Sequence, residues 1–373
     1  MKEQRKRILK MVEEGKLTVD EALTLLERLE QSAKEMEAKQ EQLVTELSTV
    51  VQPEEQTKQE KHSHSQSQSQ HSYQSTKEKI FEFVDSAVKK IKDLDLDLNF
   101  GKRMDISHIF QQADAAFKDM VIDVANGDVR VIPWDQKDIR IECKAQVYRG
   151  DNHDEAKANF LKEVTFAVKD ERLYFSTRQK WIKLETVIYV PESEYEYGDI
   201  RVFNGNVESK NIRMKKIKIK TANGKIIMDA VNSQEVEAET ANGLIQCIGC
   251  EVKSIDAETL NGAIMLNGDF CKAELQTFNG NIQCKTINHE CEVIDAKTTT
   301  GNIELAIPDQ AAVNGMLKSN LGNFNVELEG IQIIDEKSEF IQKTLNFKSV
   351  KESINMVQLY ADTKTGTIAV RKV

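Results

Sequence analysis

The chain has 373 residues and a formal net charge of −10, with 40% hydrophobic and 30% charged residues. This hydrophobic share supplies a real core, which excludes wholesale disorder. The acidic balance argues against nucleic acid as a partner, because sequence-independent binding needs a basic stripe that displaces phosphate counterions. No apolar stretch is long enough to span a membrane, and the N-terminal residues lack the apolar core of a secretory signal, so we expect a cytoplasmic protein.

Residues 1–50 carry the pattern of a helical hairpin. Thr18 and Glu21 form a capping box that opens the second helix, and Gly15 suits the end of the first. Two short helices cannot bury their apolar stripes alone, so we expect self-association, giving a homo-oligomer, or partner binding. The alternatives are packing on the rest of the chain and a thin coiled coil through Leu47. The predicted association face consists of Ile8, Met11, Val12, Ala22, Leu25, Leu26 and Leu29.

Residues 51–76 are rich in Gln, Ser and His and predict a disordered linker. A metal site at His62, His64 and His71 is not expected, because the run lacks the companions that would preorganise the ligands. Residues 77–100 predict an amphipathic helix, apolar on one side and lysine-rich around the rest. We expect it to cap the domain that follows; peripheral contact with an anionic membrane surface is the alternative.

A repeat built around glycine, most often preceded by asparagine, dominates the rest of the chain. From Gly205 to Gly322 the repeat glycines follow one another at a nearly constant spacing. A fixed period of about 20 residues is typical of solenoids, and Asn-Gly makes tight corners at little cost. The repeat glycines are Gly127, Gly205, Gly224, Gly243, Gly262, Gly280, Gly301, Gly322 and Gly366.

The residues around each glycine alternate as in a strand with one buried face. Apolar residues recur two and four positions after the glycine and seven and five positions before it, and threonine recurs three positions before it. One repeat cannot bury such a face, but stacked neighbours can. Residues 101–373 therefore predict a mainly β fold, a single-stranded, β-helix-like β-solenoid with a period of about 19–21 residues. One predicted buried column is Ile226, Ile245, Ile264 and Ile282.

The glycine repeat is interrupted in two places. The gap from Gly127 to Gly205 is close to four periods, with a short helical excursion predicted over residues 154–164. The gap from Gly322 to Gly366 is close to two periods and allows two repeats, one of them unmarked. We expect atypical capping turns at these ends.

The Thr-x-Asn-Gly-x-Ile repeats, the preceding ETVIYVPESEYEYGDIRVFNG and the DLDLNFG at residues 95–101 resemble the bacterial adhesin-type β-strand-repeat family. The N-terminal ILKMVEEGKLTVDEALTLLERLE is similar to the SHOCT-like helical domain joined to these repeats in LiaX- and YvlB-like proteins of Gram-positive bacteria. The resemblance implies a non-enzymatic role in the cell-envelope stress response, often beside phage-shock-type membrane proteins.

Cys247 and Cys250 have the spacing of a redox pair or of a zinc half-site. Cys247, however, falls in the same inward column as Met228, Leu266 and Cys284, and no second Cys-x-x-Cys completes a four-thiolate zinc site. We therefore expect buried, unreactive cysteines, and we predict no metal site, no cofactor and no catalytic residue.

Two groups of outward positions form the candidate interaction surface. Stacked carboxylates repel each other, so solvent, a basic partner or a cation must offset the repulsion within the acidic group. A catalytic role for these carboxylates is the weakest alternative, because no Arg or His recurs beside them. An apolar patch on a sheet marks a docking surface, covered by this chain or by another protein. The acidic group is Glu237, Glu239, Asp256, Glu258 and Glu274, and the apolar group is Ile227, Leu244, Ala263 and Met265.

Two functions fit these patterns. The first is a non-enzymatic interaction or scaffold protein, with protein partners for the solenoid and the hairpin. The second is a carbohydrate-binding or carbohydrate-active solenoid. Clustered exposed aromatic side chains would favour the second function, and the position of Trp134 and Trp181 outside the regular repeat counts against it.

Overall fold

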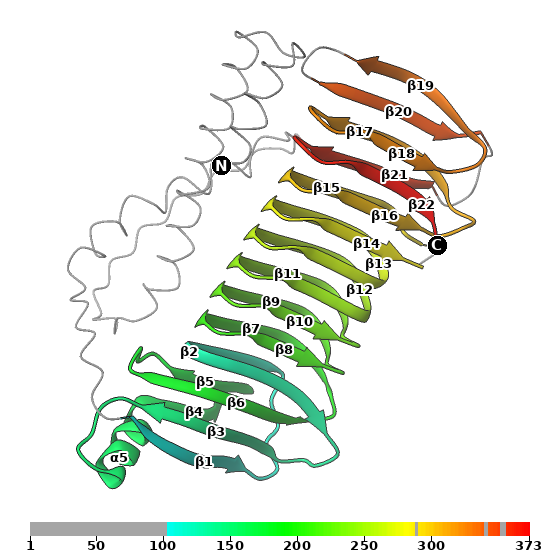
Figure 1. The fold of residues 1–373 in the computed structure, drawn as a ribbon. Helices are drawn as coiled ribbons and strands as arrows, with labels where there is room; N and C mark the ends of the chain where they lie inside the picture. Colours follow the sequence, from blue (N-terminus) through cyan, green and yellow to red (C-terminus); the bar gives the residue numbers. More distant parts are fainter. Residues whose placement is uncertain (1–102, 288–289, 339–341, 351–355) are drawn as a thin grey trace, which may run out of the picture.

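The computed structural model describes residues 103–287, 290–338, 342–350 and 356–373. The predicted hairpin with its association face, the linker and the amphipathic helix lie outside these residues. The described chain is mainly β, as predicted, and contains the helix α5 (His153–Glu163) (Figure 1). No helix in the described ranges is long and apolar enough to cross a membrane.

Long and short strands alternate through the repeats. The long strands are β7 (Glu194–Asn204), β9 (Arg213–Asn223), β11 (Asn232–Asn242), β15 (Val293–Thr300), β17 (Ala312–Ser319) and β21 (Met356–Thr363). The short strands are β8 (Val207–Lys210), β10 (Ile226–Asp229), β14 (Ile282–Thr286), β16 (Ile303–Ile307), β18 (Phe324–Glu327) and β22 (Ile368–Lys372). Three continuous strands supply both parts: β2 (Asp119–Trp134), β12 (Ile245–Asn261) and β13 (Ile264–Asn279).

Equivalent positions of neighbouring repeats pair in parallel and in register. Ile226 pairs with Ile245, Ile245 with Ile264, and Ile264 with Ile282. All four side chains are fully buried, so the predicted isoleucine column is confirmed. Inward residues of the long and short strands belong to one hydrophobic core, which leaves two outer surfaces, here called the long-strand face and the short-strand face.

The Thr-x-Asn-Gly motif holds one repeat on the next. The buried Thr259 hydroxyl donates to the carbonyl oxygen of Gly243 at 3.1 Å, and Thr221, Thr240, Thr277, Thr298 and Thr363 form the equivalent bond. The Asn261 amide donates to Asn242 at 3.0 Å in a parallel ladder. A Cβ on Gly262 would collide with the carbonyl oxygen of Gly243, so this corner requires glycine. The motif is therefore structural.

The first irregular segment is not four further repeats. A Cβ on Gly205 would collide with the carbonyl group of Gly127, which shows that these two repeats are direct neighbours. The intervening chain forms antiparallel strand pairs at this end of the stack, and α5, which confirms the predicted helical excursion, buries Ala156 and Phe160 there. The strands of the intervening chain are β3 (Ile139–Val147), β4 (Val164–Lys169), β5 (Arg172–Thr177) and β6 (Ile182–Pro191). Strand β1 (Met104–Gln112), which precedes Gly127, pairs with β3.

The second irregular segment also departs from a simple series of repeats. The last strands, β21 and β22, insert between the β15–β16 and β17–β18 repeats and pair in parallel with both. Instead of an unmarked repeat, the preceding residues form the antiparallel strands β19 (Ile331–Ser338) and β20 (Lys343–Ser349), and β20 pairs with β17. The repeat of β21 and β22 is thus the penultimate one in the stack of parallel repeats, and the repeat of β17 and β18 is the last.

Candidate interaction surface

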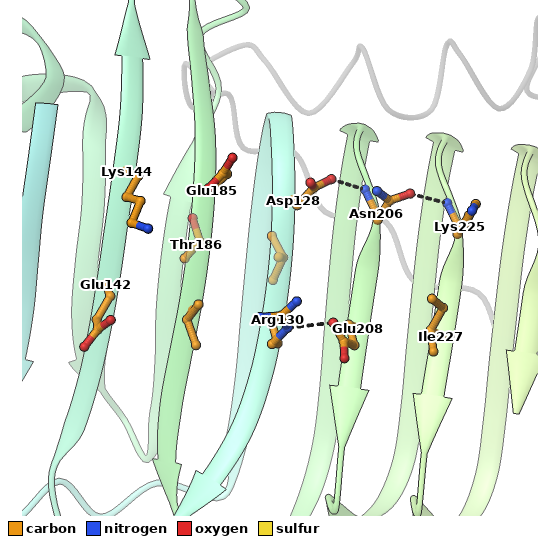
Figure 2. Close-up of a pocket in the computed structure, with 12 residues that line it drawn as sticks. Asp128, Arg130, Glu142, Lys144, Glu185, Thr186, Asn206, Glu208, Lys225 and Ile227 are labelled. Atoms are coloured by element: carbon orange, nitrogen blue, oxygen red, sulfur yellow. Dashed lines mark hydrogen bonds and ion pairs between the residues drawn. The ribbon is translucent and has the colours of Figure 1, made fainter. Parts of the chain in front are cut away.

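The short-strand face carries a pocket of about 420 Å³ where the antiparallel strands meet the stack. Figure 2 shows its walls on β3, β6, β2, β8 and β10. Lys144 and Glu185 line one side, Arg130 and Glu208 lie at the centre, and Lys225 and Ile227 line the other side. The predicted surface residue Ile227 therefore borders this pocket.

Most of the carboxylates near the pocket centre are already engaged. Arg130 Nε lies 2.6 Å from Glu208 Oε2, and Arg140 Nη2 lies 2.7 Å from Glu142 Oε1. Asp128 Oδ1 accepts the backbone N–H of Asn206 at 2.7 Å (Figure 2). These carboxylates stabilise the surface itself, so the pocket has mixed charge rather than one dominant sign.

The four predicted apolar residues lie on adjoining strands of the short-strand face. Ile227 is on β10, Leu244 directly precedes β12, and Ala263 directly precedes β13, which carries Met265. Met265 is 37% exposed and the other three are half-buried. Gln246 lies between Ile227 and Met265 in their column, so one polar side chain interrupts the patch.

The five predicted acidic residues lie together on the long-strand face. Glu237 pairs with Asp256 across neighbouring strands, and Asp256 with Glu274. Lysines of β9, which the alternation along one strand does not reveal, lie on the other side of this group. Lys218 Nζ lies 2.7 Å from Glu237, and Lys220 Nζ lies 2.7 Å from Glu239. Ion pairs within the protein therefore offset part of the predicted repulsion.

Glu237 and Glu239 have unlike environments although they share one strand. Burial raises the pKa of Glu239 to about 7. Burial opposes ionisation of Glu237 as well, but hydrogen bonds with Glu239 and Lys218 lower its pKa. Coupled carboxylates of this kind titrate as a pair, with the pKa of Glu239 raised and that of Glu237 lowered. The acidic group is therefore not a uniform row of charges.

The two tryptophans differ in their relation to the pocket. Trp134, near the end of β2, packs against Tyr189 of β6 with ring centroids 5.3 Å apart. Tyr189 follows the pocket residue Val187 by two positions, which places both on the same face. Trp181 instead donates to Gln179 at 2.9 Å and stacks under Arg149, away from these residues.

Five of the six cysteines are buried, and Cys271 is half-buried. Cys247 is 1% exposed, pairs with Met228 and Leu266 in the predicted column, and confirms the predicted burial; Cys284 lies in the next position of the same column. Burial raises the pKa of the Cys284 thiol to about 12. Within the ranges that the structure describes, no group of three His, Cys, Asp or Glu side chains could hold a metal ion.

The stacked repeats correspond to a known family. Residues 117–371 match the model of the Toastrack DUF4097 family, and residues 3–34 match a SHOCT-like domain. The chain belongs to the Toastrack DUF4097 family. Its repeats from β2 to β22 lie within the matched region, and the pocket and both candidate residue groups do so as well.

This Toastrack chain is similar along its whole length to YvlB of Bacillus subtilis (strain 168). The two are 47% identical over 371 residues, which cover 100% of this chain and 99% of the relative. Among solved structures, it resembles a "putative adhesin" of Bacteroides fragilis NCTC 9343, with 14% identity, a TM-score of 0.34 and coverage of 71% of this chain and 97% of that one. A "putative lipid binding protein" of Parabacteroides distasonis ATCC 8503 has 11% identity, a TM-score of 0.37 and coverage of 72% and 96%.

Surface residues of the regular Toastrack repeats could be predicted from the sequence, whereas the pocket residues on β3 and β6 could not. Outward positions were predictable wherever the period is regular, as at Leu244 and Met265. The pocket residues Lys144 and Glu185 lie on strands that carry no repeat, so no spacing linked them to Lys225. The Asn126-Gly127 corner is the sequence feature that could have indicated them. It marks β2 as a repeat, and a repeat needs a strand on each side, here β8 and the pocket strand β6.

Proposed function

We propose that this protein is a non-enzymatic interaction protein, in which the stacked repeats act as a rigid β-solenoid scaffold and the short-strand face binds a partner. The observation that carries the proposal is the apolar patch of Ile227, Leu244, Ala263 and Met265 beside a mixed-charge pocket. Outward residues of a sheet that faces only water are normally polar. A patch of apolar residues bordered by polar ones is typical of a docking surface.

The construction of the stack supports a scaffold. In-register pairing and the threonine bonds join each repeat to two neighbours, so the outward side chains keep fixed spacings. A rigid surface loses little conformational entropy when a partner binds. The carboxylates near the pocket centre are held by arginines or by a backbone N–H, which suits recognition better than proton transfer.

We further propose that the partner is a protein of the cell-envelope stress response, with phage-shock-type membrane proteins as the first candidates. This part of the proposal rests on the order of SHOCT-like domain and Toastrack repeats. The SHOCT-like residues would then serve for self-association or for a second partner.

Affinity capture with the full-length chain tests the proposed function. The double variant Ile227→Asp/Met265→Asp places charges on the patch, and Asn325→Asp on β18 is a matched control at the far end of the same face. We expect a discrete set of proteins that is retained by wild type and the control and lost with the double variant. An identical set for all three would contradict binding through this face.

A carbohydrate ligand is the second candidate, and one observation favours it. Trp134 and Tyr189 form an aromatic pair beside the polar pocket, and sugar rings stack on such surfaces. Trp134→Ala should then abolish binding on a glycan array without changing protein capture. If no glycan is bound by the wild-type chain, this candidate is eliminated.

A further inference from the structure

In four repeats, the outward residue that follows the corner glycine is hydrogen-bonded to the preceding repeat. Its backbone N–H points there, and an Asn or Asp side chain accepts it. Asp128 accepts from Asn206 at 2.7 Å, and Asn206 accepts from Lys225 at 2.9 Å. Farther along, Asn302 N donates to Asn281 at 2.9 Å, and Thr367 N donates to Asn302 at 2.9 Å.

Three consecutive repeats break this pattern. Lys225, Leu244 and Ala263 occupy the positions where the acceptor would stand, and none of these side chains can accept a hydrogen bond. Within the described part of the chain, the backbone N–H groups of Leu244, Ala263 and Asn281 accordingly have no acceptor. Strand spacing places these donors about 4.8 Å apart along the stack. The row coincides with the apolar patch.

The charges around the row favour an acidic ligand. Lys225, which directly precedes β10, and Lys285 on β14 lie on the two sides of the patch, and neither forms an ion pair with a described residue. The acids on the β8 and β10 side of the patch are neutralised, since Glu208 pairs with Arg130 and Asp229 pairs with Lys210 at 3.1 Å. The patch therefore presents unclaimed N–H donors and lysines, while the described carboxylates at its β8 and β10 border are paired.

We propose that this row binds a segment of a partner protein in which apolar residues alternate with acidic or amide residues. Because alternate side chains of a regular strand point to opposite faces, the segment binds in a non-strand conformation that turns both kinds of side chain toward the row. Carboxylate or amide oxygens of the segment occupy the places that Asn side chains fill in the other repeats, and its apolar side chains cover Leu244, Ala263 and Met265. Charge complementarity with Lys225 and Lys285 fixes the acidic character. The inference rests on the proposed function and names the chemistry of its partner.

Other repeats show which substitution should provide acceptors for the row of N–H groups without disturbing the fold. Leu244→Asn/Ala263→Asn restores at both positions the residue found at Asn206, Asn281 and Asn302. The new side chains should accept the N–H groups of Ala263 and Asn281, leaving only that of Leu244 without an acceptor, and replace the apolar surface at these two positions. We expect thermal stability equal to or above that of wild type, so a loss of binding cannot be attributed to unfolding.

The experiment measures fluorescence anisotropy of labelled peptides with the full-length chain. The probe is an octapeptide that alternates Asp and Leu, and the controls alternate Lys with Leu and Asp with Ser. We expect the Asp-Leu peptide to bind at least about tenfold more tightly than either control, and Leu244→Asn/Ala263→Asn to weaken it by about tenfold or more. Asn325→Leu, at the far end of the same face, should leave binding unchanged.

Three results would overturn the inference. One is equal binding of the Asp-Leu and Lys-Leu peptides, and another is unchanged binding to Leu244→Asn/Ala263→Asn. The third concerns residues 93–98 of this chain, where Asp and Leu also alternate. Binding that appears only after Leu94, Leu96 and Leu98 are replaced by Ser would assign the row to the chain's own segment. If protein capture still depends on Ile227 and Met265 in any of these cases, the proposed function stands and only the partner chemistry fails.

Discussion

Gly366 stacks directly on Gly301, although the two lie far apart in the sequence, while Gly322, the next repeat glycine after Gly301 along the chain, lies on the far side of Gly366. A Cβ on Gly366 would collide with the carbonyl group of Gly301, and a Cβ on Gly322 would collide with that of Gly366. The buried Thr363 and Ser319 hydroxyls bond to the same two carbonyl oxygens. The repeat formed by β21 and β22 therefore lies between two other repeats of the stack.

This arrangement predicts unusual protection of the C-terminal residues. Strand β21 pairs on both sides, with β15 and β17, whereas among the described strands β19 pairs with β20 alone. In hydrogen–deuterium exchange, the amides of residues 357–363 should exchange as slowly as those of β15 and far more slowly than those of β19. Rapid exchange of β21 would show that the C-terminal repeat frays.

The isoleucine column should respond strongly to truncation. Ile264→Ala removes a fully buried side chain between Ile245 and Ile282 and should lower the free energy of unfolding by about 2–5 kcal/mol in urea denaturation. Met265→Ala, on the adjacent outward position, should cost less than about 1 kcal/mol. Equal losses would mean that the two residues do not lie on opposite faces.

The threonine bonds should contribute measurably to stability. Thr259→Val keeps the shape but removes the donor to Gly243, leaving a carbonyl oxygen without its partner, and should cost about 1–3 kcal/mol. Thr367→Val, at an exposed outward position, is the matched control and should change stability by no more than about 0.5 kcal/mol. A neutral Thr259→Val would remove the structural role assigned to the motif.

The buried thiols predict a loss of stability at alkaline pH. Burial raises the pKa of Cys143, Cys284 and Cys291 to about 12 from an ordinary value of 9.0. Above pH 9 the unfolded chain releases these protons while the folded chain keeps them, so stability falls as pH rises, by about 1 kcal/mol per thiol at pH 10. Cys284→Ala should reduce the slope of stability against pH between 9 and 11. An unchanged slope would show that this thiol ionises in the folded state.

The sequence was informative where the period is regular and misleading where the chain leaves it. Ile226 to Ile282 could be placed in one column because the same spacing recurs from repeat to repeat and inward residues are apolar. The neighbours of Gly127 and Gly366 could not be predicted, because a period records the spacing along the chain but not which repeats meet after an excursion. The alternation of β17 is the same whether its repeat stacks directly on the β15–β16 repeat or, as in the structure, on the β21–β22 repeat between them.

The same limit applies to the candidate surface. The apolar residues Leu244 and Ala263 were found by their outward positions, but their significance as a gap in a row of acceptors required the hydrogen bonds of Asn206 and Asn281. The acidic residues were grouped by their outward positions, yet their charge balance depends on Lys218 and Lys220. Alternation along one strand does not show which charges the adjoining strand supplies.

The central claim is that the short-strand face binds a partner at the patch. Site-specific photo-crosslinking in the native host tests it most directly, with a benzophenone amino acid at Met265 of the full-length chain and, as the control, at Asn325 of the same face. We predict discrete adducts with another polypeptide from position 265, lost in the Leu244→Asn/Ala263→Asn background, and none from position 325. The same adducts from both positions, or none from position 265, would contradict the claim.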